Sequence, residues 1–379
     1  GPWGRRRPWI LLGSVPFGLA FFAQWLVPFP DQTWALFAYY LLVAVLFNSF
    51  YTAVNLPYTA LTPELTSDYD ERTTLNNYRF AFSIGGSLLS GVCHPIIIDY
   101  FAEDPVTGYL VAGAMWSVLA VLPLIWCYFG TFERYRYRET SIPLGRQLLI
   151  AFGSRSYQLV IGIYLCAWLA AQLTATVIPF YIRFWMGLPG VWIAYTILAV
   201  QGTAFLMLFV WNRVSRRWGK RGTFTVGAVI WALAQSMLFF VQPDQPMLML
   251  GLAVLAGSGV SVAYLIPWSM IPDVIEEDEL LTGERREGVF YSFMVFLQKL
   301  GLAGAIFLVL QALGWAGFIS SGPGDIPPVQ PESALWAIRI AIGPLPVVAL
   351  LVALVLTAYY PITRDRHMAI RLALQQRRI

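Results

Sequence analysis

The segment Gly257–Gly304, GSGVSVAYLIPWSMIPDVIEEDELLTGERREGVFYSFMVFLQKLGLAG, contains the features that decide the fold. An apolar run is followed by the acidic sequence EEDELLTGERRE and then by a second apolar run. This order predicts a membrane helix, a cytoplasmic loop and another membrane helix. Lys299 lies inside the second run, beside Phe296 and Leu300. Because a charge is costly at membrane depth, Lys299 is predicted to be functional, with snorkelling to the interface as the alternative.

An earlier segment, 55–86, has the same order of apolar run, polar loop and apolar run. The two segments share two prolines and an acidic residue: Pro57, Pro63 and Glu64 in the first, and Pro267, Pro272 and Asp273 in the second. A further match joins Trp-Gly-Arg-Arg at 3–6 to Trp-Gly-Lys-Arg at 218–221. These matches predict two parallel half-repeats.

The composition is that of a polytopic membrane protein. Hydrophobic residues make up 58% of the 379 residues and charged residues 12%, against roughly 25% charged residues in soluble domains. The charges lie in short loops between apolar runs, so the net charge of +4 does not indicate nucleic-acid binding. Cys93, Cys127 and Cys166 lie in apolar runs without metal-binding or paired spacing and are expected to pack as small hydrophobic residues.

Ten apolar runs are long enough to cross a bilayer, which takes about twenty residues. They cover residues 9–29, 34–57, 78–101, 108–130, 156–184, 190–212, 222–242, 246–270, 288–318 and 333–360. The predicted fold is therefore an all-α polytopic membrane protein. The repeat divides it into an N-terminal bundle (1–140), a C-terminal bundle (141–360) and a basic tail (361–379).

The basic residues predict the orientation in the membrane. Most of the 25 lie in alternate loops, while the opposite loops, such as PFPDQ and QPDQP, contain none. Lys and Arg accumulate on the cytoplasmic side of short loops. We therefore expect a multi-pass protein of the cell (inner) membrane with a cytoplasmic C-terminus.

The repeat also predicts helices before residue 1. Two spans precede the Trp-Gly-Lys-Arg loop at 218–221, but none precedes the matching loop at 3–6. If the halves match, roughly seventy residues and two helices come before this chain. A natural ten-helix protein is the alternative.

Small residues and prolines are predicted to shape the helices. Glycines are expected to let helix backbones approach closely, at Gly85, Gly86, Gly91, Gly301 and Gly304. Prolines are candidate bend points, at Pro57, Pro179, Pro267 and Pro344.

Several motifs, in one order along nearly the whole chain, carry a family resemblance. They are Trp3-Gly4-Arg5-Arg6-Arg7-Pro8-Trp9, Leu56-Pro57-Tyr58 through Pro63, Tyr78-Arg79-Phe80, Ile271-Pro272-Asp273-Val274, Thr282-Gly283 with Arg285 and Glu287, Tyr291-Ser292-Phe293, and Lys299. With them the chain resembles the glycoside-pentoside-hexuronide:cation symporter family, which includes melibiose permease, within the major facilitator superfamily. The resemblance implies two six-helix bundles around a central cavity and alternating access coupled to Na+ or H+, with no other cofactor. It also implies that the first two helices are missing here and carry the main cation-binding carboxylates.

The sequence does not decide between the substrates of two branches of that family. Segment 57–62 and the Phe-rich approach to Lys299 look like the lysophosphatidylcholine symporters. Where melibiose-type members carry an aspartate and a sugar-stacking tryptophan, this chain has Asn55 and Thr59, and the matching aromatic position in the span 246–270 is Tyr264. A sugar or glycoside and a lysophospholipid are both candidate substrates.

The predicted substrate and cation site contains polar and aromatic residues at membrane depth. Its members are Lys299, Asn55, Tyr58, Thr59, Tyr264, Trp268, Gln298 and Gln172. No span has a carboxylate in its middle, so an acidic partner for Lys299 is expected on the preceding helices or on the ligand. For the neutral polar residues, hydrogen bonding between helices is an equal alternative. For the aromatic residues, membrane packing is the default, because aromatics make up 16% of the chain.

A second predicted group gates the cytoplasmic side. Its members are Arg79, Glu64, Asp273, Arg285 and Arg286. Arg79 is expected to pair with Glu64 or Asp70, or merely to mark topology. The acidic run 276–279 is expected to face Arg285, Arg286 and the loop at Trp218, forming a salt-bridge lock. Each exposed pair contributes only about 0 to 1 kcal/mol, but several together would bias a two-state carrier.

The leading hypothesis is a secondary active transporter that binds its solute and cation near the midplane. A membrane-embedded enzyme is disfavoured, because the sequence shows no nucleophile with a base and no metal cluster. A solute sensor derived from a carrier would need a signalling domain, which this chain does not contain. The expected partners are a small-molecule substrate and membrane lipids, and the protein is expected to be a monomer.

Overall fold

The computed structural model describes residues 4, 6–66, 68–101, 103–133, 143, 149, 152–284, 286–320 and 328–377. They form two compact units, here called unit 1 (Gly1–Ser67 and Gly86–Arg138) and unit 2 (Asp68–Gly85 and Glu139–Ile379). The segment 68–85, which the repeat assigns to the N-terminal bundle, therefore packs in unit 2. The division into bundles at residue 140 stays a prediction.

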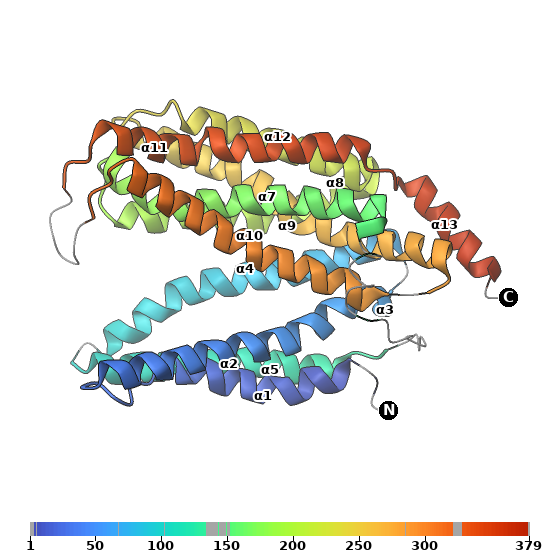
Figure 1. Cartoon of the computed structure of the whole chain (residues 1–379), viewed down its shortest axis with the longest axis horizontal. Coiled ribbons are helices and arrows are strands. Elements are labelled where there is room, and N and C mark those ends of the chain that lie inside the picture. The colour runs from blue at the N-terminus through green and yellow to red at the C-terminus, as the bar shows by residue number, and fades with distance from the viewer. Residues whose placement is uncertain are drawn as a thin grey trace. The chain divides into compact units, whose positions relative to one another are not determined.

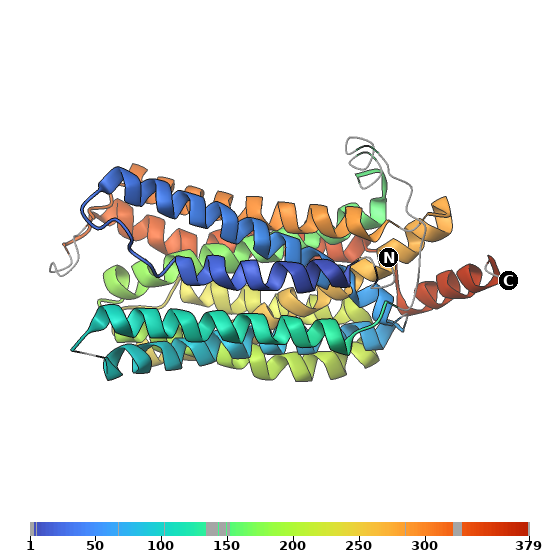
Figure 2. The ribbon, with the colours of Figure 1, turned by 90° about the horizontal axis from the view of Figure 1, so that it is seen from below.

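Unit 1 contains α1 (Arg7–Ala23), α2 (Thr33–Ala60), the short α3 (Thr62–Leu65), the later part of α4 (Tyr69–Tyr100) and α5 (Pro105–Gly130). Helix α1 packs against both α2 and α5 (Figure 2). Its glycines permit this approach, since a Cβ at Gly13 would meet Val54 and one at Gly18 would meet Val121. A small apolar cluster of Ile10, Val54 and Leu61 lies at this contact.

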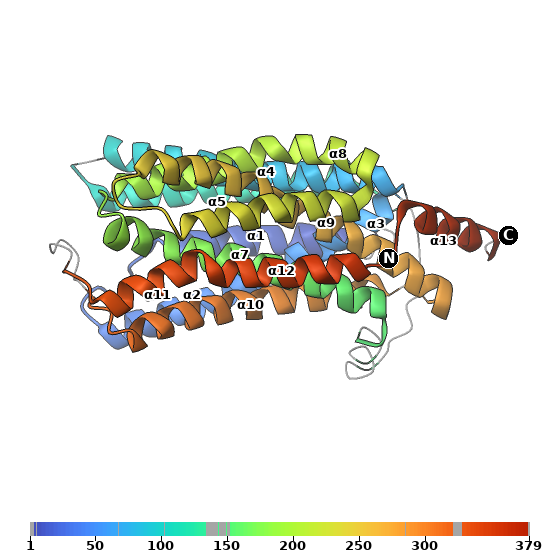
Figure 3. The same cartoon turned by 90° about the horizontal axis from the view of Figure 1, so that it is seen from above.

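Unit 2 contains the remaining helices, which Figure 1 labels. They are α7 (Arg155–Phe180), the π-helical turn η1 (Tyr181–Trp185), α8 (Val191–Leu238), α9 (Pro246–Thr282), α10 (Glu287–Trp315), α11 (Glu332–Ile342), α12 (Pro344–Tyr359) and α13 (Arg364–Arg377). Helix α9 packs along α8, and α7 packs against α9, α10 and α12 (Figure 3). Side chains of α7, α8, α9, α10 and α11 form an apolar core that includes Val177, Leu252 and Val309.

Helix α9 is the central helix of unit 2, buried almost continuously from Ala256 to Glu279. Its small residues allow close packing on α8: a Cβ at Gly259 would meet the backbone of Trp231 and the carbonyl oxygen of Gly227. Three of the predicted packing glycines differ, because no atom of the described residues lies within 4 Å of a Cβ built at Gly86, Gly91 or Gly304. The described residues therefore place no close helix contact at these three glycines, and their packing role stays a prediction.

The helices follow the predicted spans with two differences. Eight helices in the described part of the chain are long and apolar enough to cross a membrane, and α1 is shorter. Helix α8 covers two predicted spans and the loop between them, broken only at Gly219, where φ is 70°. The last predicted span is split between α11 and α12 at Pro344, one of the predicted bend points. The described residues form no strand, as the all-α prediction requires.

Candidate functional site

One end of unit 2 contains buried charges on four helices. Asp273 of α9 is fully buried, and Lys220 of α8 donates a hydrogen bond of 2.6 Å to its Oδ2. Lys220 follows the break at Gly219, and its Nζ also donates to the carbonyl oxygen of Ser269 at 2.7 Å. Asp273 and Lys220 thus neutralise each other without access to water.

Arg72, near the start of α4, joins this pair. Its side chain is fully buried and donates to Oε1 of Glu276, one turn after Asp273 on α9. Another guanidinium nitrogen of Arg72 lies 3.7 Å from Oδ1 of Asp273. Arg72 therefore links the first turn of α4 to Asp273 and Glu276 of α9.

His367 of α13 completes the group. Its Nε2 lies 2.8 Å from Oε2 of Glu276 and 3.6 Å from Oδ1 of Asp273. Together Arg72, Lys220, Asp273, Glu276 and His367 are called the Asp273 cluster. Removing one partner from a buried ion pair leaves an uncompensated charge and typically destabilises a protein by about 3 to 5 kcal/mol. The cluster therefore makes the docking of α4, α8, α9 and α13 at this end interdependent.

More exposed ion pairs surround the Asp273 cluster. Arg366 of α13 pairs with Glu277 at 2.6 Å, and Arg364 pairs with Asp70 of α4. Arg286 lies 2.8 Å from Glu284 and 3.8 Å from Asp278. Such pairs contribute only about 0 to 1 kcal/mol each. They extend the contact between α13, α9 and α4 without dominating its stability.

The predicted gating residues are only partly where the sequence suggested. Asp273 lies at the centre of the cluster, and Arg286 pairs with the acidic segment next to it. Asp70, proposed as a partner of Arg79, pairs with Arg364 instead. The side chain of Glu64 and all of Arg285 lie outside the described residues. The acidic run thus has its main partners on α4 and α13.

The sequence did not single out three members of the Asp273 cluster, although the loop that contains Lys220 was expected to face the acidic run. Lys220 had a signal, because it belongs to the repeated Trp-Gly-Lys-Arg motif. No sequence pattern pointed to Arg72 or His367, because each is separated from Glu276 by a long stretch of chain and belongs to no motif. His367 lies in the segment that was expected only to be a basic tail with a cytoplasmic end, yet helix α13 of that segment packs against α9.

Two of the predicted binding residues, Tyr264 and Trp268, come together on α9 within an aromatic group. Phe80 of α4 stacks on Tyr264 with ring centroids 5.8 Å apart and contacts Trp268 edge-on at 6.2 Å. The guanidinium of Arg79 lies over the ring of Trp268, 4.2 Å from its centroid. Trp268 is therefore 4% exposed. Arg79 lies beside a predicted binding residue, and its guanidinium covers the ring that a ligand would use.

The other predicted binding residues are spread over both units. In unit 2, Lys299 is exposed on α10, and Gln298 and Gln172 are half-buried. In unit 1, Asn55 and Tyr58 are half-buried on α2. Thr59, also on α2, is fully buried and donates to the carbonyl oxygen of Leu56. The described residues thus leave the ammonium group of Lys299 exposed, whereas the hydroxyl of Thr59 bonds within its own helix.

The helical architecture is that of the major facilitator fold. The fucose:proton symporter of Escherichia coli matches 94% of this chain and 84% of its own, with a TM-score of 0.66 and 13% identity. A bacterial homologue of the iron transporter ferroportin matches 94% of this chain and 83% of its own, with a TM-score of 0.68 and 14% identity. At these identities the likeness concerns the fold alone.

The chain belongs to the MFS/sugar transport protein family, whose model matches residues 1–364. An uncharacterised symporter of Synechocystis is 42% identical, with 99% of this chain and 84% of the relative covered. The human sodium-dependent lysophosphatidylcholine symporter 1 is 26% identical, over 99% of this chain and 74% of its own. A putative glycoside/cation symporter of Escherichia coli is 25% identical, over 97% and 79%. The predicted family is confirmed: this is a multi-pass membrane transporter of a symporter family and not an enzyme.

Proposed function

We propose that the protein is a cation-coupled symporter for a sugar or glycoside that works by alternating access. Membership of a symporter family supports the transport class, and the names of its relatives support coupling to a cation, Na+ or H+. The solute and the ion would bind near the membrane midplane, and the protein would work as a monomer in the cell membrane with its C-terminus in the cytoplasm. No other cofactor is required.

The Asp273 cluster carries the alternating-access part of the proposal. A buried group of compensated charges is stable when all its members are in place and unfavourable when one is withdrawn. Such a group suits a gate with two discrete states. In the closed state Arg72 and His367 hold α4 and α13 on α9, and in the open state water would hydrate the separated charges. Asp273 and Arg286 keep the gating roles predicted from the sequence, as do Glu64 and Arg285.

The proposed binding residues combine an aromatic surface with cationic groups. Tyr264 is half-buried next to Trp268, and Arg79 covers one of the two rings. Aromatic faces are suited to sugar rings, while Lys299 and Arg79 are suited to an acidic group on the substrate. A solute with an acidic group could draw Arg79 away from Trp268 and so expose the ring. Asn55, Tyr58, Thr59, Gln298 and Gln172 remain proposed members of the site.

A lysophospholipid is the second candidate substrate. It is favoured by the match of nearly the whole chain to the sodium-dependent lysophosphatidylcholine symporter and by segment 57–62. Its phosphate would use the same cationic residues as an acidic sugar. The two substrates differ in their apolar part, so uptake assays can distinguish them.

The experiment is uptake into proteoliposomes with and without an inward Na+ gradient, and separately with a pH gradient. Glycosides, uronates and lysophospholipids are the test compounds. We expect gradient-dependent uptake of one class, abolished by Lys299→Ala and by Arg79→Gln. Leu300→Ala, an exposed neighbour of Lys299 on α10, is the matched control and should transport normally.

Two results would overturn this proposal. Uptake that ignores both gradients would indicate a facilitator rather than a symporter. Gradient-driven uptake that is unaffected by Lys299→Ala and Arg79→Gln would remove both residues from the binding site.

A further inference from the structure

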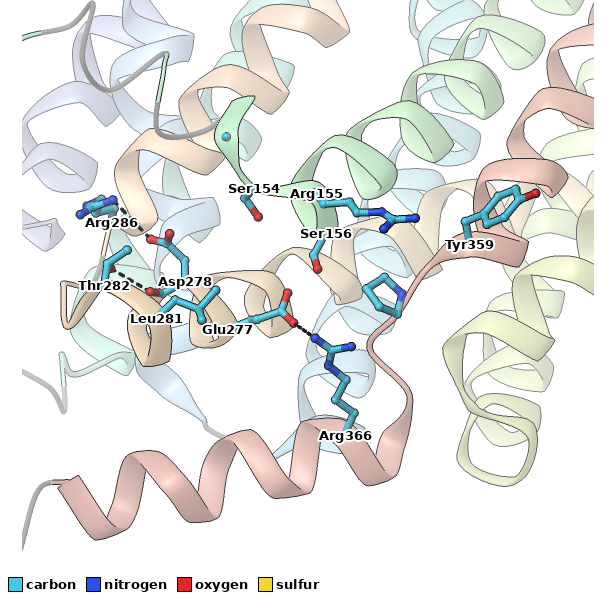
Figure 4. A pocket seen from close by; sticks show the side chains of 12 residues that line it. Ser154, Arg155, Ser156, Glu277, Asp278, Leu281, Thr282, Arg286, Tyr359 and Arg366 are labelled. Carbon is cyan, nitrogen blue, oxygen red and sulfur yellow. Dashed lines mark hydrogen bonds and ion pairs between the residues drawn. The ribbon is translucent and has the colours of Figure 1, made fainter.

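A cavity of about 740 Å³ lies in unit 2 beside the start of α13, where Arg366 is one of its lining residues (Figure 4). Its walls come from the start of α7, the end of α9, the link from α9 to α10, and the connection from α12 to α13. The volume is in the range of small-molecule sites, roughly 300 to 1,000 Å³. Its lining includes Arg286, which has a proposed gating role, and Glu277 and Asp278 of the acidic run that is expected to form the salt-bridge lock.

The start of α7 supplies hydrogen-bond donors to this cavity. Ser154 caps the helix by accepting from the N–H of Tyr157 at 3.3 Å. The N–H groups of Arg155 and Ser156 have no acceptor within the described part of the chain. Free N–H groups and the helix dipole make a helix N-terminus suited to anions.

Ser156 is a second and independent sign of a ligand. It is only 5% exposed, yet its hydroxyl has no hydrogen-bond partner among the described residues. Figure 4 shows this hydroxyl pointing into the cavity. The hydroxyl oxygen is therefore open to the cavity, where it can form a hydrogen bond with a ligand.

The arginines of the cavity are not equivalent. Arg366 is paired with Glu277 at 2.6 Å and Arg286 with Glu284 at 2.8 Å. Arg155 has no ion pair or hydrogen bond within the described residues, and its side chain is exposed. Arg155 is therefore available to a ligand, next to the free N–H groups of α7.

The opposite wall is acidic. Asp278 is a buried carboxylate whose Oδ2 accepts no hydrogen bond in the part of the chain described, and Arg286 lies 3.8 Å away. The cavity thus has a donor-rich wall on α7 and an unsatisfied acceptor on α9. A molecule with an anionic and a cationic end complements both walls.

We propose that this cavity binds a phosphate ester that carries an amine. The phosphate oxygens accept hydrogen bonds from the N–H groups of Arg155 and Ser156, from the Ser156 hydroxyl and from the Arg155 guanidinium. The amine donates to Asp278. The same chemistry is present in a soluble aminoalkyl phosphate and in the headgroup of phosphatidylethanolamine. This site shares Arg286, Glu277 and Asp278 with the predicted cytoplasmic gate, and it does not depend on the proposed substrate.

The test measures binding to the purified full chain in two arms. The soluble arm titrates O-phosphoethanolamine, inorganic phosphate and ethanolamine by calorimetry in detergent. The lipid arm counts retained phosphatidylethanolamine and phosphatidylcholine by native mass spectrometry after reconstitution in nanodiscs of each lipid. Saturable binding of O-phosphoethanolamine supports a soluble ligand, and selective retention of phosphatidylethanolamine supports a lipid.

The variants are Arg155→Gln and Ser156→Ala, with Arg217→Gln as the control at another exposed arginine. Hydrogen bonds to a charged group contribute about 1.5 to 3 kcal/mol, so Arg155→Gln should weaken binding about tenfold or more. Ser156→Ala should weaken it less and Arg217→Gln not at all. Each variant should keep the unliganded melting temperature. Absence of binding in both arms, or equal binding by all variants, would overturn the proposal.

Discussion

Glu276 and Glu277 are neighbours in the sequence but lie in different electrostatic surroundings. Glu276 is buried between Arg72 and His367, whereas Glu277 pairs with Arg366, whose side chain is 52% exposed. Water screens the second pair and not the first. Two adjacent carboxylates in one helix therefore differ in what they contribute to stability.

We expect Glu276→Gln to destabilise the protein by about 3 to 5 kcal/mol, because Arg72 is left buried beside a neutral group. Glu277→Gln should change stability by no more than about 1 kcal/mol. Thermal unfolding in detergent measures both. Equal melting temperatures for the two variants would show that the cluster is hydrated rather than buried.

The pair Lys220 and Asp273 allows a direct test of whether two buried side chains of the cluster interact. Lys220→Met alone should be strongly destabilising, since Asp273 then loses its closest cation. Adding Asp273→Leu removes the orphaned carboxylate and should restore part of the lost stability. A double-mutant cycle from thermal unfolding gives the interaction energy. Strictly additive effects would contradict direct pairing of these side chains.

At the scale of elements, the contact of α8 with α9 is the most extensive helix contact in unit 2. It depends on small residues of α9 that face the backbone of α8, Gly259 above all. The glycines singled out in the sequence, such as Gly304 on α10, have open space beside them. The sequence alone did not distinguish Gly259 from Gly304, because the difference depends on which helix lies opposite each glycine.

The same substitution at two glycines tests this difference. Gly259→Ala should destabilise unit 2 by about 1 to 3 kcal/mol, because the added methyl group meets backbone atoms of α8 that cannot move aside. Gly304→Ala should be neutral or stabilising by up to about 1 kcal/mol, as expected for alanine in a helix. Thermal melting of both variants is the measurement. A larger loss at Gly304 would mean that α10 packs more closely than the structure shows.

At the scale of the whole molecule, the C-terminal tail is a structural part of unit 2. Helix α13 contributes His367 to the Asp273 cluster and buries Ile370 and Leu374. The residues of α4 and α9 that α13 contacts lie in the same unit as α13. Loss of the tail should therefore affect the end of unit 2 that carries the cluster and leave the rest of the chain unchanged.

Deletion of residues 364–379 should raise amide hydrogen exchange in the last turns of α9 and the first turns of α4. The reason is that Glu276 loses one of its two side-chain partners and the tail no longer covers it. Exchange in α1, α2 and α5 of unit 1 should stay as it is. Hydrogen exchange followed by mass spectrometry makes the comparison. Uniformly faster exchange would indicate global destabilisation instead of a local role.

Most of the fold could be predicted from the sequence, whereas much of the candidate site could not. Long apolar runs specify membrane helices locally, because lipid cannot hydrogen-bond to the backbone. The motifs around Pro57 and Pro272 identified the family. The pairing of Arg72 and His367 with Glu276 needed the tertiary structure, since any basic residue of the loops could in principle have supplied the charge.

The sequence by itself determined the helices, the transporter family and the presence of an acidic segment at the end of α9. Each of these follows from local composition or from the repeat, which tertiary contacts do not alter. Only the tertiary structure decided that Lys299 is exposed, that Arg79 covers Trp268 and that the tail belongs to the Asp273 cluster. These depend on which side chains are withdrawn from water together, and that is set by packing between helices far apart in the chain.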